Sequence, residues 1–136
     1  MQVLPKRGRL LKTIRLPCRV KPLPRPRLCS TKFGQRVFQP LGNQHEFRAL
    51  VGREPELMVT SPVIVDSYAY FKPSKRLKFP ATRAYGDEDN IRKAICDALQ
   101  AAKIITDDAL IVGGENFKLF GDDNGVVINI YEAEAA

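Results

Sequence analysis

The chain has 136 residues and a formal net charge of +7, with 44% hydrophobic and 27% charged residues. This length suits one domain with one hydrophobic core. No apolar run is long enough to span a bilayer, and the N-terminus lacks the apolar stretch of a secretory signal. Its Arg-rich, acid-free start also fits a mitochondrial presequence, but the prolines and strand pattern that follow disfavour one. We therefore expect a soluble single-domain protein.

The cysteines and the histidine limit the metal and redox chemistry of the chain. Cys18, Cys29 and Cys96 form no C-x-x-C pair, and His45 has no partner pattern around it. A Cys/His zinc site therefore lacks its usual ligands. We expect reduced thiols in a cytoplasmic protein, and we assign no catalytic role to His45.

The charges are unevenly placed along the chain. Residues 1–45 contain no Asp or Glu, whereas the acidic residues gather after Asp87. Such an asymmetry indicates a polyanionic partner, DNA or RNA first and a membrane surface second. The early basic residues are Lys6, Arg7, Arg9, Lys12, Arg15, Arg19, Lys21, Arg25, Arg27, Lys32 and Arg36.

The first third of the chain predicts short strands and a rigid loop. Residues 1–12 are basic and aperiodic, which indicates a loose extension. Three prolines in KPLPRPR, residues 21–27, exclude a regular helix and favour a rigid basic loop. The alternative is a polyproline ligand for an SH3-type domain. We expect an edge strand over 13–20, interrupted by Pro17, a strand over 34–39 and a helix over 43–52.

The rest of the chain has clearer periodicity. Residues 62–71 are β-branched and aromatic, which predicts a strand before a Lys-rich loop at 72–78. Apolar residues at helical spacing predict a helix over 91–103 with Asp89 or Asn90 as its N-cap. Residues 110–119 and 126–131 read as strands paired through the GDDNG turn. The order β-β-α-β-α-β-β predicts an α/β (α+β) domain, a mixed β-sheet with two main helices packed on it.

The stretch YGDEDNIRKAICDAL, residues 85–99, gathers carboxylates in this basic chain. If the chain is extended as it enters the helix, Asp87 and Asp89 point the same way and Glu88 points opposite. Two such carboxylates can hold Mg²⁺, which prefers oxygen ligands. A third carboxylate is available from TDD, residues 106–108, where the chain leaves the helix.

Lys93 lies one turn into the expected helix, and Asp97 at i+4 from it can pair with it and fix its position. Together with the helix N-terminus, which suits a phosphate, these groups could cut a phosphodiester. The structural alternative is that Asp87–Asn90 only cap the helix. A calcium loop fits poorly, because Arg92 and Ala98 stand where that loop needs Gly and Glu.

The combined pattern resembles the RusA-like Holliday junction resolvases, small endonucleases common in bacteria and their prophages. The resemblance covers residues 14–131. Between the two aspartates the family usually has an apolar residue, whereas this chain has Glu88. PLPRPR also resembles the basic segment that precedes the core in phage-type members. The matching residues are Asp87, Asp89, Asn90, Lys93, Ala94, Asp97, Ala98, Leu99, Asp107 and Asp108.

The resemblance implies a homodimeric endonuclease, over residues 13–136, that nicks four-way junction DNA in pairs with Mg²⁺ or Mn²⁺. Asp87, Asp89 and Asp108 would be its metal-binding catalytic carboxylates, and Lys93 its catalytic lysine. Asn90, Asp97 and Asp107 would support them. The rival hypothesis is a non-catalytic nucleic-acid-binding module. We expect backbone phosphates to be contacted by Arg19, Lys21, Arg25, Arg27, Lys75, Arg76 and Lys78.

Overall fold

The computed structural model describes residues 2–20, 27–31, 34–38 and 45–136. It confirms a mixed α/β domain. The proline-rich stretch 21–26, with both of its interpretations, lies outside the described residues. The elements are β1 (Pro5–Leu16), β2 (Arg27–Thr31), β3 (Gly34–Phe38), α1 (His45–Gly52), β4 (Val63–Phe71), the 3₁₀ turn η1 (Arg83–Tyr85), α2 (Glu88–Ala101), the 3₁₀ turn η2 (Asp108–Leu110), β5 (Ile111–Gly113), β6 (Asn116–Phe120) and β7 (Gly125–Ala135).

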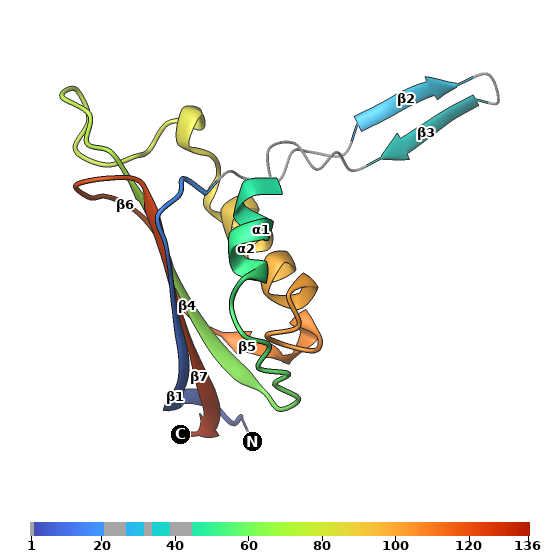
Figure 1. Cartoon of the computed structure of the whole chain (residues 1–136), viewed down its shortest axis with the longest axis vertical. Helices are drawn as coiled ribbons and strands as arrows, with labels where there is room; N and C mark the ends of the chain where they lie inside the picture. The colour runs from blue at the N-terminus through green and yellow to red at the C-terminus, as the bar shows by residue number, and fades with distance from the viewer. Residues whose placement is uncertain (1, 21–26, 32–33, 39–44) are drawn as a thin grey trace.

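The central strand of the main sheet is β4. One of its edges pairs antiparallel with β7, and β7 pairs in turn with β1. Its other edge pairs parallel with β5 and then β6. A separate two-stranded sheet joins β2 and β3, and β2 was not predicted. Figure 1 shows α1 and α2 together on one side of the main sheet.

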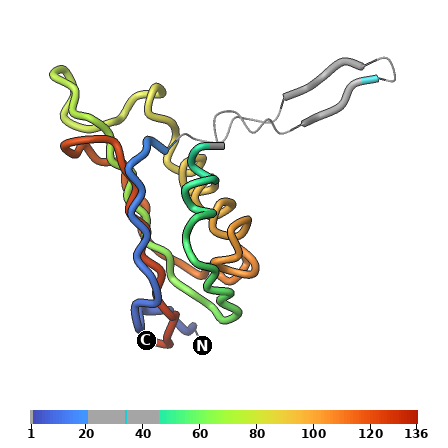
Figure 2. The backbone as a smooth tube through the Cα atoms, in the orientation of Figure 1, coloured from blue at the N-terminus to red at the C-terminus, as the bar shows by residue number. Residues whose placement is uncertain are grey.

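The hydrophobic core lies between this sheet and the two helices. Alternate residues of β4, Val63, Val65, Ala69 and Phe71, belong to it. The predicted stripe of α2 is confirmed, because Ile91, Ala94, Ile95, Ala98 and Leu99 are all buried. Burial of each large apolar side chain contributes about 1.5–3 kcal/mol. This packing holds α2 alongside the middle of the sheet (Figure 2).

The predicted hairpin between residues 110–119 and 126–131 is wrong. The chain leaves β6 on one side of β4 and returns as β7 on the other. The Asn-Gly signal reports a turn, but it does not determine which strands pair. The central strand needs hydrogen-bond partners on both edges, and this crossing supplies them.

The loose extension predicted over residues 1–12 is also wrong, because β1 begins at Pro5. This strand pairs with β7 from Pro5–Ala135 to Leu16–Val126, with register shifts between Arg7 and Lys12. The irregular register breaks the two-residue alternation, which is why the sequence looks aperiodic there. The predicted edge position is confirmed, and Pro17 follows the last residue of the strand.

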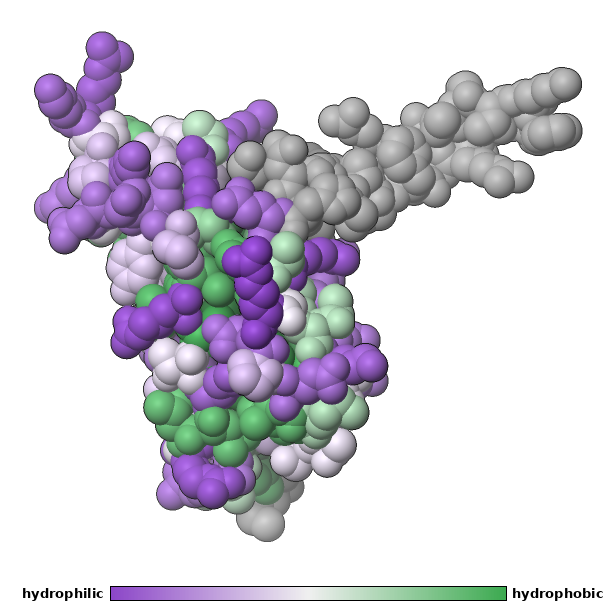
Figure 3. Space-filling model, viewed as in Figure 1, coloured by the Kyte–Doolittle hydropathy of each residue, from purple (hydrophilic) through white to green (hydrophobic). Residues whose placement is uncertain are grey.

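Both termini lie at the same end of the molecule, where the backbone N–H of Ala136 donates to the carbonyl of Leu4 at 2.9 Å. The loop after β4 and the start of α2 lie at the opposite end (Figure 1). In Figure 3 hydrophilic side chains cover much of that end. Among the described residues, no helix has the length and apolar character needed to cross a membrane.

Candidate active site

The first turn of α2 presents three exposed carboxylates, Asp87, Glu88 and Asp89. Asp87 is the N-cap, with extended backbone angles of φ −77° and ψ 142°, and the helix begins at Glu88. The predicted start at residue 91 and the predicted cap at Asp89 or Asn90 are therefore wrong. Asp89 already lies within the helix, so the extended geometry assumed for both aspartates holds only for Asp87. We call residues 86–89 the acidic turn.

The two helix starts near the candidate carboxylates differ in their N-caps. The side chain of Asp87 makes no capping hydrogen bond, although it occupies the N-cap. Asp107, by contrast, caps η2 by accepting a hydrogen bond from the N–H of Ala109 at 3.0 Å. In the first turn of α2, Asp89 accepts a hydrogen bond from the backbone N–H of Asn90 at 3.0 Å, so a carboxylate binds a backbone N–H at each of the two helix starts.

Two side chains of β6 hold the backbone of the acidic turn. The ammonium of Lys118 donates to the carbonyl of Gly86 at 2.8 Å. The amide of Asn116 donates to the carbonyl of Glu88 at 2.9 Å. These bonds flank Asp87 on both sides, and Gly86 has a positive φ of 91°. Because glycine can adopt many backbone conformations, the two bonds restrict a turn that would otherwise move.

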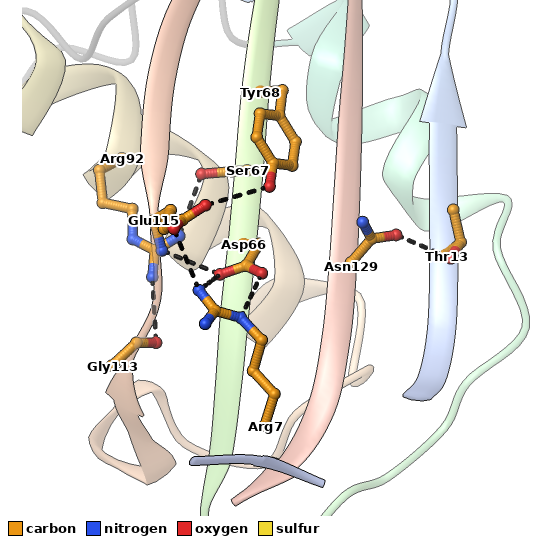
Figure 4. Close-up of polar contacts among 9 residues, drawn as sticks. All are labelled: Arg7, Thr13, Asp66, Ser67, Tyr68, Arg92, Gly113, Glu115 and Asn129. Atoms are coloured by element: carbon orange, nitrogen blue, oxygen red, sulfur yellow. Dashed lines mark hydrogen bonds and ion pairs between the residues drawn. The ribbon is translucent and has the colours of Figure 1, made fainter. Parts of the chain in front are cut away.

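A polar network between the sheet and α2 orients the side-chain amide of Asn116. Ser67 donates to the carbonyl oxygen of the Asn116 side chain at 2.9 Å, which leaves the amide N–H of Asn116 for Glu88. Arg92 donates in turn to the hydroxyl of Ser67 at 3.0 Å and to the carbonyl of Gly113 at 3.5 Å (Figure 4). Since Arg92 belongs to α2, the network ties the helix back to the sheet beneath its own first turn.

For an Mg²⁺-dependent nuclease, which the sequence resemblance implies, we expect Lys118→Met to slow cleavage about 10- to 100-fold and to raise the Mg²⁺ concentration needed for half-maximal rate. The carbonyl of Gly86 loses its donor, so Asp87 is no longer fixed. Cleavage assays over a Mg²⁺ titration measure both effects. Lys6→Met removes one exposed ammonium elsewhere and should change neither. Wild-type kinetics for Lys118→Met would show that the turn does not need this bond.

An ion pair between the exposed Arg7 and the buried Asp66, on the other face of β4, was not foreseen from the sequence. Arg7 donates two hydrogen bonds to the carboxylate of Asp66, at 2.7 and 2.8 Å, and the backbone N–H of Glu115 donates a third at 2.9 Å. The Asp66 side chain is 4% exposed. Burial raises its pKa, but the bonds from Arg7 and Glu115 and the charges of Arg7 and Arg92 outweigh burial and lower it overall.

We expect Asp66→Asn to lower the free energy of unfolding at neutral pH by about 1–2 kcal/mol, because Arg7 loses its nearest charged partner and keeps only Glu115, at 3.6 Å. A lowered carboxyl pKa adds stability above the unfolded-state value near 3.9, and that stability is lost as the pH falls through the folded-state value. The difference in the free energy of unfolding between wild type and variant should therefore disappear below about pH 4. Urea unfolding at several pH values measures it.

The exposed pair between Lys72 and Asp123 provides the matched control. Its side chains are 68% and 75% exposed and 3.7 Å apart. Asp123→Asn should change stability by less than about 0.5 kcal/mol. Equal losses in the free energy of unfolding for Asp66→Asn and Asp123→Asn would contradict a special role for the pair of Arg7 with Asp66.

The helical candidates lie on the exposed side of α2. Lys93 is exposed and Asn90 and Asp97 are half-buried. The predicted ion pair of Lys93 with Asp97 is not among the ion pairs of the described residues. Asp97 instead lines a shallow cleft with Arg48, Gln100 and Ala101. Lys93 therefore keeps an accessible ammonium one turn beyond Asp89.

Asp108 lies beside the far half of α2. Its backbone N–H donates to the side-chain oxygen of Gln100 at 3.2 Å. Burial raises the pKa of the Cys96 thiol, and the charges of Asp97 and Asp108 raise it further. Figure 1 shows the chain reaching η2 at the end of α2 opposite its start. In the described part of a single chain, no three Asp, Glu, His or Cys residues are grouped to hold a metal ion.

The acidic turn still fits a hard cation. Carboxylate oxygens are the ligands that Mg²⁺ prefers, and proteins commonly bind it through one or two carboxylates together with substrate phosphates. Asp87 and Asp89 offer such a pair beside a helix N-terminus, which favours phosphate. A three-carboxylate cage within one chain does not fit.

The basic candidates differ in what they contact. The guanidinium of Arg19 donates to the carbonyl of Ala84 at 2.8 Å and lies over the rings of Phe71 and Tyr85, at 5.3 and 5.4 Å from their centroids. One of its N–H donors and the face of its guanidinium are therefore already engaged within the protein. Lys75, Arg76 and Lys78 are exposed in the loop after β4. Lys21 and Arg25 lie outside the described residues, as does the side chain of Arg27.

A sheet covered by helices on one face, an acidic helix start and an exposed basic loop after β4 characterise this small α/β protein. A family model described as endodeoxyribonuclease RusA matches residues 17–131. The chain belongs to this family, which confirms the resemblance seen in the sequence. No curated protein matches the chain.

Proposed function

We propose that the protein is a metal-dependent, structure-selective DNA endonuclease that resolves Holliday junctions by paired nicks in recombination and repair. The observation that carries the proposal is the acidic turn of a RusA-family chain, held on both sides of Asp87 by Lys118 and Asn116. The turn is thus held from a neighbouring strand, which would keep its carboxylates in place for a metal ion.

The catalytic roles follow the family positions. Asp87 and Asp89 would hold Mg²⁺ or Mn²⁺ together with Asp108, which lies beside the far half of α2 and would have to come from a second chain, and Lys93 would neutralise charge that grows on the phosphate. The bound metal would activate water and stabilise the leaving oxygen. The chain itself fixes the carboxylates: β6 holds the acidic turn, and Asn90 and Asp97 lie on the same exposed side of α2. Asp107 keeps the backbone around Asp108 in place through its cap.

The metal requirement is tested by incubating a four-way junction with the protein in Mg²⁺ and in EDTA. We expect cleavage in Mg²⁺, none in EDTA, and binding in both. Binding without cleavage under any divalent metal would favour a non-catalytic binding module instead.

Backbone phosphates would be bound by the exposed loop after β4, together with the basic candidates of the N-terminal third. We expect Lys75→Ala to weaken junction binding and to reduce the slope of log K against log salt by about one unit. Fluorescence anisotropy at several salt concentrations measures the slope. Lys6→Ala removes the same charge near the opposite end of the sheet and should leave the slope unchanged. Equal slopes for both variants would remove Lys75 from the interface.

A symmetric junction needs two cuts, so the proposed working form is a cytoplasmic homodimer with two active sites. Light scattering should give about twice the chain mass of 15.3 kDa. The mass of one chain at working concentration would contradict this part of the proposal. Cys18 and Cys96 are free thiols, in keeping with a reducing compartment.

A further inference from the structure

The carbonyl of Ala84, two residues before Gly86, also accepts a hydrogen bond from a distant side chain. Arg19 donates this bond at 2.8 Å. The two bonds that β6 makes to the acidic turn end on the carbonyls of residues 86 and 88. Every second carbonyl from residue 84 to residue 88 is therefore held by a side chain of another part of the fold, and Arg19 holds the first of them.

Arg19 is well placed to act as an anchor. Its chain neighbours Cys18 and Val20 are both buried, so its backbone is held against the core while its side chain lies at the surface. The guanidinium lies over the rings of Phe71 and Tyr85, at 5.3 and 5.4 Å from their centroids. A cation over an aromatic ring is attracted by the negative face of the ring. Arg19 thus connects the buried end of β4 to η1.

The ring of Tyr85 joins η1 to the core. It meets the ring of Phe71 edge to face at 5.0 Å between centroids, and the ring of Phe120 at 5.7 Å. Such edge-to-face pairs add to the stabilisation that burial gives. Gly86, which follows directly, has a positive φ of 91°. Since a glycine links Tyr85 to Asp87, the start of the acidic turn depends on how firmly Tyr85 is held.

We propose that Arg19 is a positioning residue for the active site, which holds η1 and thereby fixes where the acidic turn begins. This inference rests on the proposed function, and it gives Arg19 a role besides contact with backbone phosphates. A phosphate contact needs a positive charge, which lysine also carries. Holding η1 needs a guanidinium, which can lie over two rings and still donate to a carbonyl, whereas an ammonium is a compact point charge.

Arg19→Lys separates the two roles. Because the charge is kept, junction affinity should stay within about twofold of wild type, with the same salt slope. Cleavage should slow about 10-fold or more, and the Mg²⁺ concentration for half-maximal rate should rise, as when an outer contact of a metal site is lost. Arg9→Lys is the matched control, since Arg9 is exposed and donates to Glu132 at 3.0 Å, and it should change neither quantity. Wild-type cleavage by Arg19→Lys would overturn the inference.

Hydrogen exchange of the DNA-free protein gives a readout that needs neither metal nor activity. The backbone N–H groups of Tyr85 and Gly86 donate within η1, at 3.1 and 3.0 Å. Arg19→Lys should speed exchange over residues 83–87 and leave exchange in β7 unchanged. Unchanged exchange over residues 83–87, or equal acceleration in β7, would show that Arg19 does not hold η1 in particular.

A double-mutant cycle with Tyr85→Leu completes the test. If the guanidinium and the ring hold the same segment, the double variant should cleave within about twofold of the slower single variant. Losses that multiply would mean separate roles and would contradict the inference. If the wild-type protein itself fails to cleave, the proposed function fails, and exchange still decides whether Arg19 holds η1. If wild type and Arg19→Lys cleave equally fast, the positioning role alone is wrong.

Discussion

Asp89→Asn should abolish cleavage of a four-way junction, by about 10³-fold or more, and leave junction binding within about threefold of wild type. A neutral amide is a poor ligand for a hard cation, and a metal contributes several kcal/mol of transition-state charge stabilisation. Each 1.4 kcal/mol corresponds to a factor of ten in rate. Single-turnover cleavage and anisotropy binding measure the two quantities.

Glu88→Gln is the matched control on the same turn. Glu88 is exposed, and its backbone carbonyl, which the substitution keeps, accepts the bond from Asn116. This variant removes one negative charge one residue away and should cleave within a few-fold of wild type. Equal losses for Glu88→Gln and Asp89→Asn would mean that the turn acts only through its total charge. Unchanged cleavage by Asp89→Asn would remove Asp89 from the chemistry.

Gly114→Ala should give the largest loss of stability, about 4 kcal/mol or more, which approaches the whole stability of many domains. Gly114 has a φ of 136°, and a Cβ there would collide with the carbonyl of Val65 and meet the guanidinium of Arg92. The collision is with backbone of the central strand, which cannot move aside. Relief would require β6 to separate from β4, and the acidic turn would lose its support from Lys118 and Asn116.

The neighbouring glycine tests this explanation. A Cβ on Gly113 meets nothing within 4 Å, and its φ lies outside the left-handed range. Gly113→Ala should therefore keep the wild-type midpoint in urea unfolding to within about 0.5 kcal/mol. Similar losses for both substitutions would show that flexibility, and not the close approach at Gly114, is what matters.

Periodicity predicted the parts of the fold that are governed by local burial. The stripe from Ile91 to Leu99 and the apolar run of β4 were recognisable because their side chains face one core. The pairing of β6 was not, because its partner is chosen by the free edge of β4 and not by its own residues. The strand β1 was missed over its first two thirds, residues 5–12, where the shifted register hides the alternation.

The candidate site was predictable in composition but not in arrangement. The spacing of Asp87, Asp89 and Lys93 pointed to the acidic turn, and the family match supports it. Lys118 and Asn116 gave no signal, since their role depends on which strand passes beneath the turn. Arg7 and Asp66 are 59 positions apart, and only the sheet brings them together. The position of Asp108 follows from the length of α2. The sequence spacing alone did not show whether Asp108 lies near the acidic turn.

The most direct test of the central claim is to map the cuts on a four-way junction with end-labelled strands, beside a linear duplex of the same sequence. The account predicts Mg²⁺-dependent nicks at symmetric positions in two opposing strands, ligatable linear products, and no cleavage of the duplex. Equal cleavage of both substrates, or binding of the junction without any nick, would contradict it.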